Sequence, residues 1–493
     1  RINKILITES KIFKKYFEKN VGKNTNQNIT YNDVINSISK YGKINGPELF
    51  AGFEDLSEIN LDEYLIKCDI IRIEGAITRV SKDEVAFNIL NNHLLKIITE
   101  VEDHRSNKIL QNILRYRKMM SKNILRKIMN YVHANIQKFD SLTLMRCSKI
   151  GEDINELNKG LELLEKLGTD SAEKLISDII EKKMWLKDGY DLDNIIEGIS
   201  KNFTVEKIPE KILYFVHSDL PYKTSGYTIR TQGVVNSLKN RGLDPEVVSR
   251  WGFPTDRNDF QSDLEVKKLY VDENGIFHHV DHSNMGMAEL QNQEYIAEAS
   301  QKLVEKCKLI KPSVIISASD HVTGLIGLVA SRKLKIPFFY EMRGIWAFTR
   351  ATNNPNYDGS FDYELRVKLE KQCALNADRV IVISEAMKKI VIRWGEKESK
   401  IRILHNGINM EKISKYKYKQ LGSQKTLGYI GSIVPYEGLM STIKSLKYIK
   451  DRNGSCPKFL IAGDGVEKHK LEEFVKYNDV EEEVKFLGVI PHD

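Results

Sequence analysis

The chain has 493 residues, of which 41% are hydrophobic and 29% charged, and its formal net charge is +7. This length and apolar content predict several globular domains and exclude a disordered or fibrous chain. So small a positive charge does not by itself indicate a nucleic-acid partner. No apolar run approaches the ~20 residues that cross a bilayer, so we expect a soluble or peripheral protein.

Cysteine usage indicates a reducing environment. The five cysteines are scattered, and none forms a CxxC pair or a Cys/His metal spacing: Cys68, Cys147, Cys307, Cys373 and Cys456. We therefore expect free thiols and a cytoplasmic protein. No metal or other cofactor is expected. The chain starts at Arg1 without a signal peptide and stops at Asp493 after a strand-like segment, which suggests a fragment of a longer polypeptide.

Residues 1–205 predict a mainly helical region of unknown role, with short strands at 70–73 and 84–87. The stretch 105–138 contains nine basic and no acidic residues, and its apolar residues recur at helical spacing. In 152–197 the balance reverses, because Asp and Glu outnumber Lys and Arg. The first interpretation of this charge pattern is that the basic and acidic helices pack together in one module. The alternatives are that the basic stretch forms a face that binds anionic membrane lipid, or that it forms a nucleic-acid surface. The lack of interleaved aromatic residues argues against nucleic acid.

Residues 206–398 predict a Rossmann-like α/β domain. Buried-strand patterns alternate with helical segments at the spacing of a parallel sheet, at 211–217, 245–248, 312–317, 336–341 and 377–384. A second, partial domain of the same type is predicted for 399–493. Its apolar runs 427–430, 458–462 and 484–487 each lead into a glycine. The predicted fold class is therefore α/β, with two Rossmann-like domains after a helical region.

Several strand-end motifs occur in a characteristic order from residue 210 onward: His405-Asn406-Gly407, Gly431-Ser432 through Tyr436-Glu437-Gly438, and Gly463-Asp464-Gly465. This order resembles GT-B glycosyltransferases of family 4, in particular a subset with a Tyr-Glu-Gly segment. The resemblance implies a bacterial, hexosyltransferase-type enzyme with retaining, metal-independent chemistry. Its donor would be a nucleotide-diphosphate sugar, and its acceptor a glycan or lipid-linked saccharide in surface polysaccharide synthesis.

The first domain carries a candidate phosphate-binding loop. Ser225, Gly226 and Tyr227 follow a predicted strand and open a helix that contains Arg230. Backbone N–H groups and the positive helix end at such a position suit a diphosphate. The alternative is an ordinary strand–helix turn.

Candidate catalytic residues follow the next strands. Glu341 and Arg343 stand where many family members place a histidine, and Arg343 could hold a diphosphate or an anionic acceptor. A salt-bridged structural pair is the alternative. His321 ends the preceding strand and is a candidate for sugar contact, with a structural histidine as the alternative. His217 is a weaker candidate.

The second domain supplies the remaining candidates. Gly431, Ser432, Glu437 and Gly463 correspond to the family's phosphate-binding region, where many members have Arg and Lys in place of Ser432 and Glu437. The usual basic clamp is therefore missing, and Arg230 or Arg343 could compensate. Asn406 and Gly407 are a predicted hinge.

The chain stops before the family's Glu-x7-Glu motif, so we expect an incomplete donor pocket and little turnover. A nucleotide-sugar epimerase of the same fold and a non-catalytic GT-B-like scaffold are the alternative functions. A NAD-dependent enzyme is disfavoured because no GxGxxG follows the strands at 211 and 426.

Overall fold

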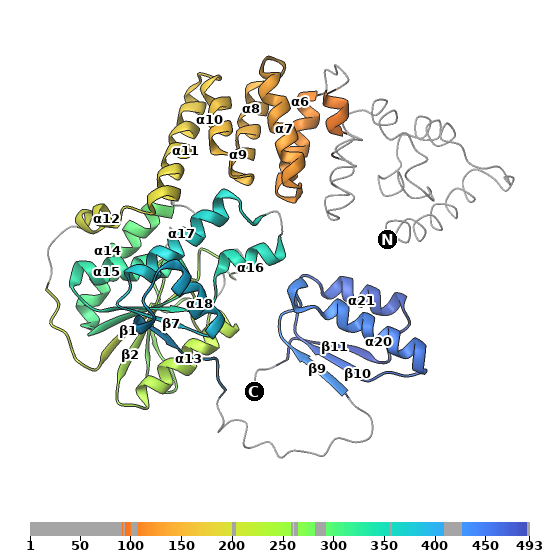
Figure 1. Ribbon diagram of the computed structural model, residues 1–493. Helices are drawn as coiled ribbons and strands as arrows, with labels where there is room; N and C mark the ends of the chain where they lie inside the picture. Colours follow the sequence, from red (N-terminus) through yellow and green to blue (C-terminus); the bar gives the residue numbers. More distant parts are fainter. Residues whose placement is uncertain are drawn as a thin grey trace. The chain divides into compact units, whose positions relative to one another are not determined.

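The computed structural model describes residues 91, 94–99, 106–199, 204–257, 260, 265–281, 292–354, 357–408 and 426–490. The chain forms two compact units that divide after Leu404 (Figure 1), and each unit is described by itself. Cys68 and the strands expected at 70–73 and 84–87 lie outside the described residues.

An eight-stranded sheet forms the centre of the first unit, in the order β3-β4-β2-β1-β5-β6-β7-β8. Neighbouring strands are parallel except for the antiparallel pair β3 and β4. The strands are β1 Lys211–Val216, β2 Asp244–Ser249, β3 Leu269–Val271, β4 Phe277–His279, β5 Val314–Ala318, β6 Phe338–Met342, β7 Arg379–Val382 and β8 Ile401–Ile403.

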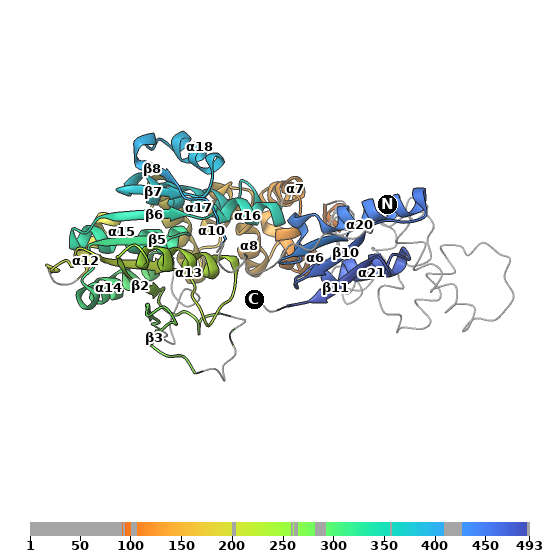
Figure 2. The same cartoon turned by 90° about the horizontal axis from the view of Figure 1, so that it is seen from below.

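Helices cover both faces of this sheet (Figures 1 and 2), as expected for strands that are buried on both sides. The helices are α13 Gly226–Lys239, α14 Asn292–Ile310, α15 His321–Leu334, α16 Trp346–Asn353, α17 Phe361–Asn376 and α18 Glu385–Trp394. The chain builds β2 and β4 on one side of β1 and then β5 to β8 on the other. The order therefore reverses between β1 and β5, and ligands of such sheets bind at the carboxyl ends of the strands at this point.

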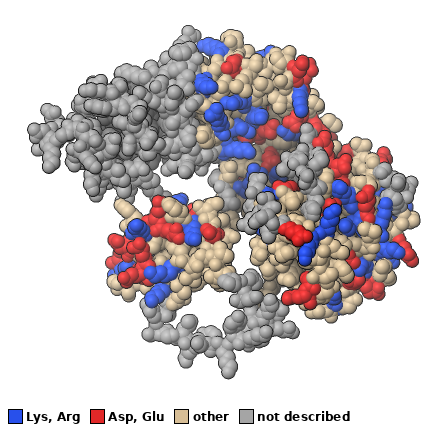
Figure 3. Space-filling view, turned by 180° about the vertical axis from the view of Figure 1, so that it is seen from behind, with Lys and Arg blue, Asp and Glu red and all other residues tan. Residues whose placement is uncertain are grey.

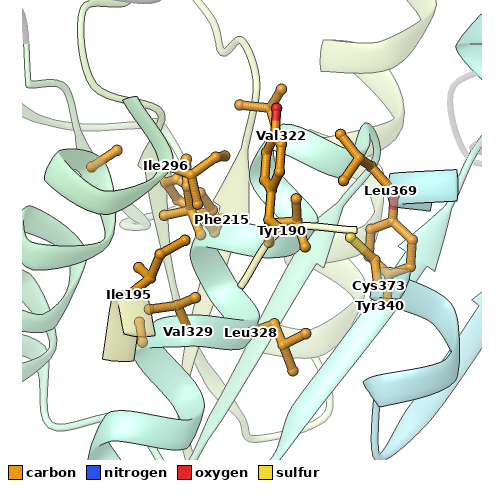
Figure 4. Packing of buried hydrophobic residues seen from close by; sticks show 14 of the residues in the cluster. Tyr190, Ile195, Phe215, Ile296, Val322, Leu328, Val329, Tyr340, Leu369 and Cys373 are labelled. Atoms are coloured by element: carbon orange, nitrogen blue, oxygen red, sulfur yellow. The ribbon is translucent and has the colours of Figure 1, made fainter. Parts of the chain in front are cut away.

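Side chains alternate between two cores along the strands. Phe215 and Tyr340 point into the larger core with α14, α15 and α17, where Tyr340 lies beside Cys373 and Leu369 (Figure 4). Tyr214 and Val216 point into a smaller core with α13. Each strand end can therefore present polar groups to both faces of the sheet.

The predicted α/β fold is confirmed, with differences in detail. The three-residue strands β3 and β4, and helices α14 and α16, were not predicted. The predicted second domain began at residue 399, but β8 pairs with β7 and belongs to the first sheet. An isolated three-residue strand gives no periodicity from which its partner could be inferred.

A helical module precedes the sheet and belongs to the same unit. Its helices are α6 Ser106–Ile113, the 3₁₀ helix η3 Leu114–Met119, α7 Lys122–Ala134, α8 Ser141–Ser148, α9 Ile150–Asp153, α10 Leu157–Glu165, α11 Asp170–Asp188 and α12 Leu192–Gly198. Most of the helices enclose their own hydrophobic core.

The basic and acidic stretches of this module face each other. Arg117 contacts Asp153 at 2.6 Å, and Arg126 contacts Glu156 at 2.8 Å. Figure 3 shows Lys and Arg gathered on part of the module, with Asp and Glu beside them. The apolar residues of the basic stretch are buried in the module core, so the folded helices do not offer them to a lipid surface: Ile109, Ile113, Met120, Ile124, Ile128 and Val132.

The module is joined to the sheet domain through α17. The Gln372 side chain accepts a hydrogen bond from the Tyr190 N–H at 3.1 Å and donates one to the Tyr190 carbonyl at 2.8 Å. Lys368 donates to the Lys187 carbonyl at 2.9 Å from the same helix. The side chains of α17 therefore connect the module to the larger core.

The second unit contains a three-stranded parallel sheet in the order β11-β10-β9. Its elements are β9 Thr426–Ile430, α20 Leu439–Asn453, β10 Lys458–Ala462, α21 Lys468–Tyr477 and β11 Val484–Gly488. Both helices pack through one hydrophobic core that includes Ile443, Ile461 and Leu471. The strands predicted for this segment are confirmed.

None of the helices in the described part of the chain is long and apolar enough to pass through a membrane. The four cysteines within it, Cys147, Cys307, Cys373 and Cys456, are free thiols.

Candidate functional site

A buried charge cluster lies at the carboxyl end of β6, on the α13 side of the sheet. Glu341 is 1% exposed, and Arg230 of α13 donates to its Oε1 atom from Nε at 3.0 Å and from Nη2 at 2.9 Å. Its Oε2 atom accepts hydrogen bonds from Arg343 Nη2, at 3.1 Å, and from the Tyr214 hydroxyl. One carboxylate therefore joins β1, β6 and α13.

Arg343 extends this cluster to the start of α13. Its Nη1 atom donates to the Tyr227 carbonyl and to the Thr231 hydroxyl, both at 2.8 Å. The guanidinium lies over the Tyr227 ring, 4.6 Å from its centroid. Arg343 thereby holds the first turn of the helix that follows the candidate phosphate loop.

The Tyr227 hydroxyl lies between the two strands at which the strand order reverses. It accepts a hydrogen bond from the His217 N–H at 3.0 Å and donates one to the Ala318 carbonyl at 2.8 Å. These are backbone groups at the ends of β1 and β5, so the Tyr227 side chain fixes the helix at the expected ligand edge.

Ser225 and Gly226 begin α13. The Ser225 hydroxyl accepts a hydrogen bond from the Thr228 N–H at 3.4 Å, and the Thr228 hydroxyl accepts one from the Ser225 N–H at 3.0 Å. This capping box explains Ser225 without a ligand. A Cβ atom at Gly226 would meet nothing within 4 Å, so packing does not require this glycine.

Arg230 has a further contact outside the carboxylate. Its Nη2 atom donates to the carbonyl of Leu404 at 2.9 Å. Leu404 is the last residue of the first unit. The predicted hinge residues Asn406 and Gly407 follow it and are exposed.

The charges of this cluster compensate one another. Burial alone would raise the pKa of Glu341, but Arg343, the Tyr214 hydroxyl and Arg230 outweigh it and hold this pKa below its ordinary value. Glu341 is therefore an anion at neutral pH. Both guanidiniums are engaged with it, which is the salt-bridged arrangement that the sequence offered as the alternative to phosphate binding.

His321 lies on the opposite face of the sheet. It is the first residue of α15 and is 6% exposed, and its Nδ1 atom is 4.0 Å from Glu370 Oε2. Burial is the main cause that lowers the pKa of His321, so its ring is neutral at pH 7. His321 is not in the cluster that contains Glu341 and Arg343.

His217 follows β1 at the same edge of the sheet. Its ring lies edge-on to Trp346 of α16, with centroids 5.0 Å apart, and Trp346 is 39% exposed. Burial lowers the pKa of His217 to about 4, so this ring is also neutral. The pair offers an aromatic surface and an uncharged hydrogen-bonding group.

In the second unit, the predicted glycines are brought together by the loops that follow β9 and β10. The Gly431 N–H donates to the Ala462 carbonyl at 3.0 Å, and a Cβ atom at Gly463 would lie 1.9 Å from the Gly431 carbonyl oxygen. Ser432 and Glu437 are exposed in the segment that follows β9. Close backbone packing therefore explains Gly463.

Replacing Gly463 by alanine is expected to destabilise the second unit by about 3 kcal/mol or more. The residue has φ +136°, and the added Cβ would collide with the backbone of Gly431. Hydrogen exchange of the amides in β9, β10 and β11 would measure the loss. Gly454→Ala is the control, because φ there is +76° but nothing lies within 4 Å, and it should cost only about 1–2 kcal/mol. Equal costs for both variants would contradict the packing argument.

Sequence reasoning missed Tyr214, Thr231 and Glu370. Tyr214 is an ordinary residue of an apolar strand, and only the fold brings it to Glu341. Glu370 did carry a signal, because it lies on the stripe of α17 formed by Leu365, Leu369 and Cys373, all of which are buried. A glutamate on an apolar stripe indicates a buried carboxyl.

Within the described ranges, no group of three or more His, Cys, Asp or Glu side chains is arranged to hold a metal ion.

Comparison with known proteins gives one matching family model, one similar curated protein and several similar solved structures. Residues 225–407 match the sequence model of the glycosyl transferase 4-like domain. The capsular polysaccharide biosynthesis glycosyltransferase CapM of Staphylococcus aureus is 30% identical over an alignment of 177 residues, with a coverage of 33% of this chain and 44% of that protein. The chain thus spans less than half the length of this relative.

Similar solved structures include HepE of Anabaena in complex with UDP, at 19% identity and a TM-score of 0.39, covering 57% of this chain and 69% of that one. The catalytic domain of starch synthase IV from Arabidopsis thaliana has 13% identity and a TM-score of 0.40, with coverages of 59% and 75%. The matched residues include Arg230, Glu341 and Arg343 of the charge cluster as well as His321, whereas Tyr214 and His217 precede the match. Residues 225–407 of this chain are therefore similar to the glycosyl transferase 4-like domain and to part of a capsular polysaccharide glycosyltransferase.

Proposed function

We propose that the protein is a retaining glycosyltransferase of hexosyltransferase type. It transfers a sugar from a nucleotide-diphosphate sugar to a glycan or lipid-linked acceptor during bacterial surface polysaccharide synthesis. It works in the cytoplasm, at the inner face of the membrane when its acceptor is lipid-linked. The observation that carries the proposal is the glycosyl transferase 4-like match over residues 225–407, supported by 30% identity to a capsular polysaccharide glycosyltransferase.

In this proposal the first unit supplies a preorganised edge of the sheet. Arg343 and Tyr227 hold the N-terminal turn of α13, whose N–H groups suit a negatively charged group. Preorganised donors stabilise the charge that develops on the leaving diphosphate. Arg230 and Arg343 act by positioning this turn, because Glu341 already engages both guanidiniums.

The second unit supplies a close-packed glycine loop. Ser432 offers its exposed hydroxyl to the donor. The Gly431 N–H is already engaged with the Ala462 carbonyl, and the family's basic clamp is not needed for the Ser432 contact. The reaction requires no metal in this proposal, and the transferred sugar keeps its anomeric configuration.

Titration calorimetry with UDP and UDP-glucose would test donor binding by the purified protein. The proposal expects both to bind, and it expects any glycosylated product formed with an acceptor present to retain the anomeric configuration. Incubation with donor alone provides the discriminating control. An epimerised sugar from the donor alone would replace the proposal with an epimerase, and no binding of any nucleotide sugar would favour a non-catalytic scaffold.

A further inference from the structure

Two buried glutamates, Glu341 of β6 and Glu370 of α17, have similar hydroxyl partners but different charge surroundings. Tyr340 and Glu341 are consecutive, so their side chains point to opposite faces of the sheet. On one face Glu341 accepts from the Tyr214 hydroxyl, and on the other Glu370 Oε1 accepts from the Tyr340 hydroxyl at 2.6 Å. Glu341 is 1% exposed and Glu370 is 3% exposed.

The difference lies in the cations. Glu341 contacts Arg230 and Arg343, whereas within the described part of the chain no Lys or Arg nitrogen lies within 4.0 Å of the Glu370 carboxyl oxygens. An unpaired buried carboxylate is far more costly than a neutral carboxyl group. The surroundings therefore favour the ionised form of Glu341 and the protonated form of Glu370.

His321 is the chargeable neighbour of Glu370, and its position also disfavours a charge. The two side chains are 4.0 Å apart at their nearest nitrogen and oxygen, which is too long for a hydrogen bond. His321 begins the 14-residue helix α15, and the positive end of a helix opposes an imidazolium. Both groups are buried, so neither a charged histidine nor an ion pair with Glu370 is favoured.

We propose that Glu370 is a positioning residue that keeps its proton at neutral pH and holds His321 as an uncharged imidazole at the ligand edge of the sheet. Two residues of helix α17 lie against His321. Glu370 Oε2 is 4.0 Å from its Nδ1 atom, and Cys373 Sγ donates to its carbonyl at 3.5 Å. A neutral imidazole suits a hydroxyl group of a sugar better than a phosphate. This use in sugar transfer rests on the proposed function, but the protonation states do not.

The groups that face this pair agree with the proposal. Burial is the main cause that raises the pKa of Glu370 to about 8, and Asp320 adds to it. The hydrogen bonds from the Tyr340 hydroxyl and from the His321 backbone oppose this rise in pKa. Around His321, burial lowers the pKa, Asp320 and Asp362 oppose this, and Arg366 adds to it. Tyr340 and Cys373 have raised pKa values and are uncharged.

Packing around the pair is tight enough to fix its geometry. A Cβ atom at Gly324 would lie 2.7 Å from Cys373 Sγ and 2.8 Å from Tyr340 Cε2. Helix α15 therefore approaches β6 and α17 closely, and Figure 4 shows Tyr340 and Cys373 side by side in this core. This close approach brings His321 against Glu370.

The test compares Glu370→Gln with the matched variant Glu341→Gln. Glutamine resembles a protonated glutamate, so Glu370→Gln should keep the denaturation midpoint of the wild type at about pH 4.5 and exceed it increasingly up to about pH 8, because over this range the unfolded wild type ionises Glu370 while the folded wild type keeps the proton. Glu341→Gln removes a needed anion and should lower the midpoint at both pH values. A Glu370→Gln variant that is weakened equally at both pH values would overturn the proposal.

Nitrogen NMR of histidine-labelled protein reads the state of His321 without any assay of activity. The signal is assigned with His321→Gln among the 11 histidines of the chain. The proposal expects a neutral ring at pH 7 in the wild type and in Glu370→Gln, and an imidazolium in the wild type would contradict it. If Glu370→Gln does not fold, the infrared band of a protonated carboxyl in the wild type should disappear as the pH rises through about 8. Its absence at about pH 6 would also refute the proposal.

These readouts separate this inference from the proposed function. If the protein binds no nucleotide sugar but Glu370 and His321 are both uncharged, the inference about the pair holds and the proposed function is wrong. If the protein transfers sugar but His321 is charged at pH 7, the proposed function holds and the inference is wrong.

Discussion

Glu341→Ala is expected to lower the free energy of unfolding of the first unit by about 3–5 kcal/mol. The substitution leaves the buried guanidiniums of Arg230 and Arg343 without their shared anion, and the Tyr214 hydroxyl loses its acceptor. Breaking one partner of a buried ion pair costs far more than the pair contributes as a whole. Hydrogen exchange of the amides in β1 and β6 would measure this loss within the first unit.

Glu398→Ala is the matched control for this experiment. Glu398 also contacts a cation, Lys388, at 2.8 Å, but its side chain is 70% exposed. Water replaces the lost partner at such a position, so the stability of the first unit should not change measurably. The interpretation of the Glu341 cluster would be wrong if Glu341→Ala were as mild as this control.

The same substitution has a consequence for the ligand edge. Arg343 holds the carbonyl of Tyr227 and lies over its ring, so loss of Glu341 frees the group that fixes the start of α13. We therefore expect Glu341→Ala to reduce donor binding together with stability. Arg230 and Arg343 would affect binding in the same indirect way.

Much of the fold could be predicted because its strands are buried on both faces. The apolar runs that became β1, β5, β6 and β7 are continuous, and each is followed by a helical segment, which is typical of a parallel sheet. The hairpin of β3 and β4 could not be predicted in this way. Its strands have three residues each, and Leu269, Val271 and Phe277 are exposed, so no burial pattern marks them.

The candidate site was predictable only where its residues are close in sequence. Glu341 and Arg343 are two positions apart at a strand end, so their side chains share a face and the pair could be proposed from the sequence. Tyr214 and Arg230 reach the same carboxylate from β1 and α13, more than 100 residues away. Only the sheet order brings these groups together, and the sequence contains no local signal for it.

The proton states of the histidines depend on contacts of the same long-range kind. His217 and His321 follow strands and His278 lies in one, yet burial lowers the pKa of His217 and His321, while that of His278 is raised. The charged side chains next to each histidine decide whether its pKa is raised or lowered. His278 has carboxylates on both ring nitrogens, and the other two do not.

Asp219→Asn is expected to destabilise the first unit strongly at low pH and much less at high pH. Asp219 follows β1 and is 1% exposed, and His278 of β4 is 3% exposed with its Nδ1 atom 2.6 Å from Asp219 Oδ2. Asp272 lies 3.5 Å from the other ring nitrogen, and the Tyr270 ring stacks on the imidazole at 4.5 Å. This contact ties the candidate loop after β1 to the hairpin.

The pH dependence follows from the direction of the His278 shift. Burial alone would lower the pKa of His278, but Asp219 and then Asp272 outweigh it and raise this pKa above its ordinary value. A raised pKa means that the folded state binds the proton more tightly than the unfolded state does. The stabilisation is therefore complete below the ordinary histidine pKa of about 6.5 and is lost as the pH rises through the higher folded value.

The difference in unfolding free energy between the wild type and Asp219→Asn should therefore be greatest at about pH 6, at about 2–3 kcal/mol, and should shrink as the pH rises. Denaturant unfolding across this range would measure it, with histidine NMR to follow His278 directly. The Glu370→Gln comparison moves the other way, since that variant gains on the wild type at high pH, so the two effects can be told apart in one titration series. A difference for Asp219→Asn that stays constant with pH would show that His278 is uncharged beside Asp219, and that the loop after β1 is held by neutral hydrogen bonds.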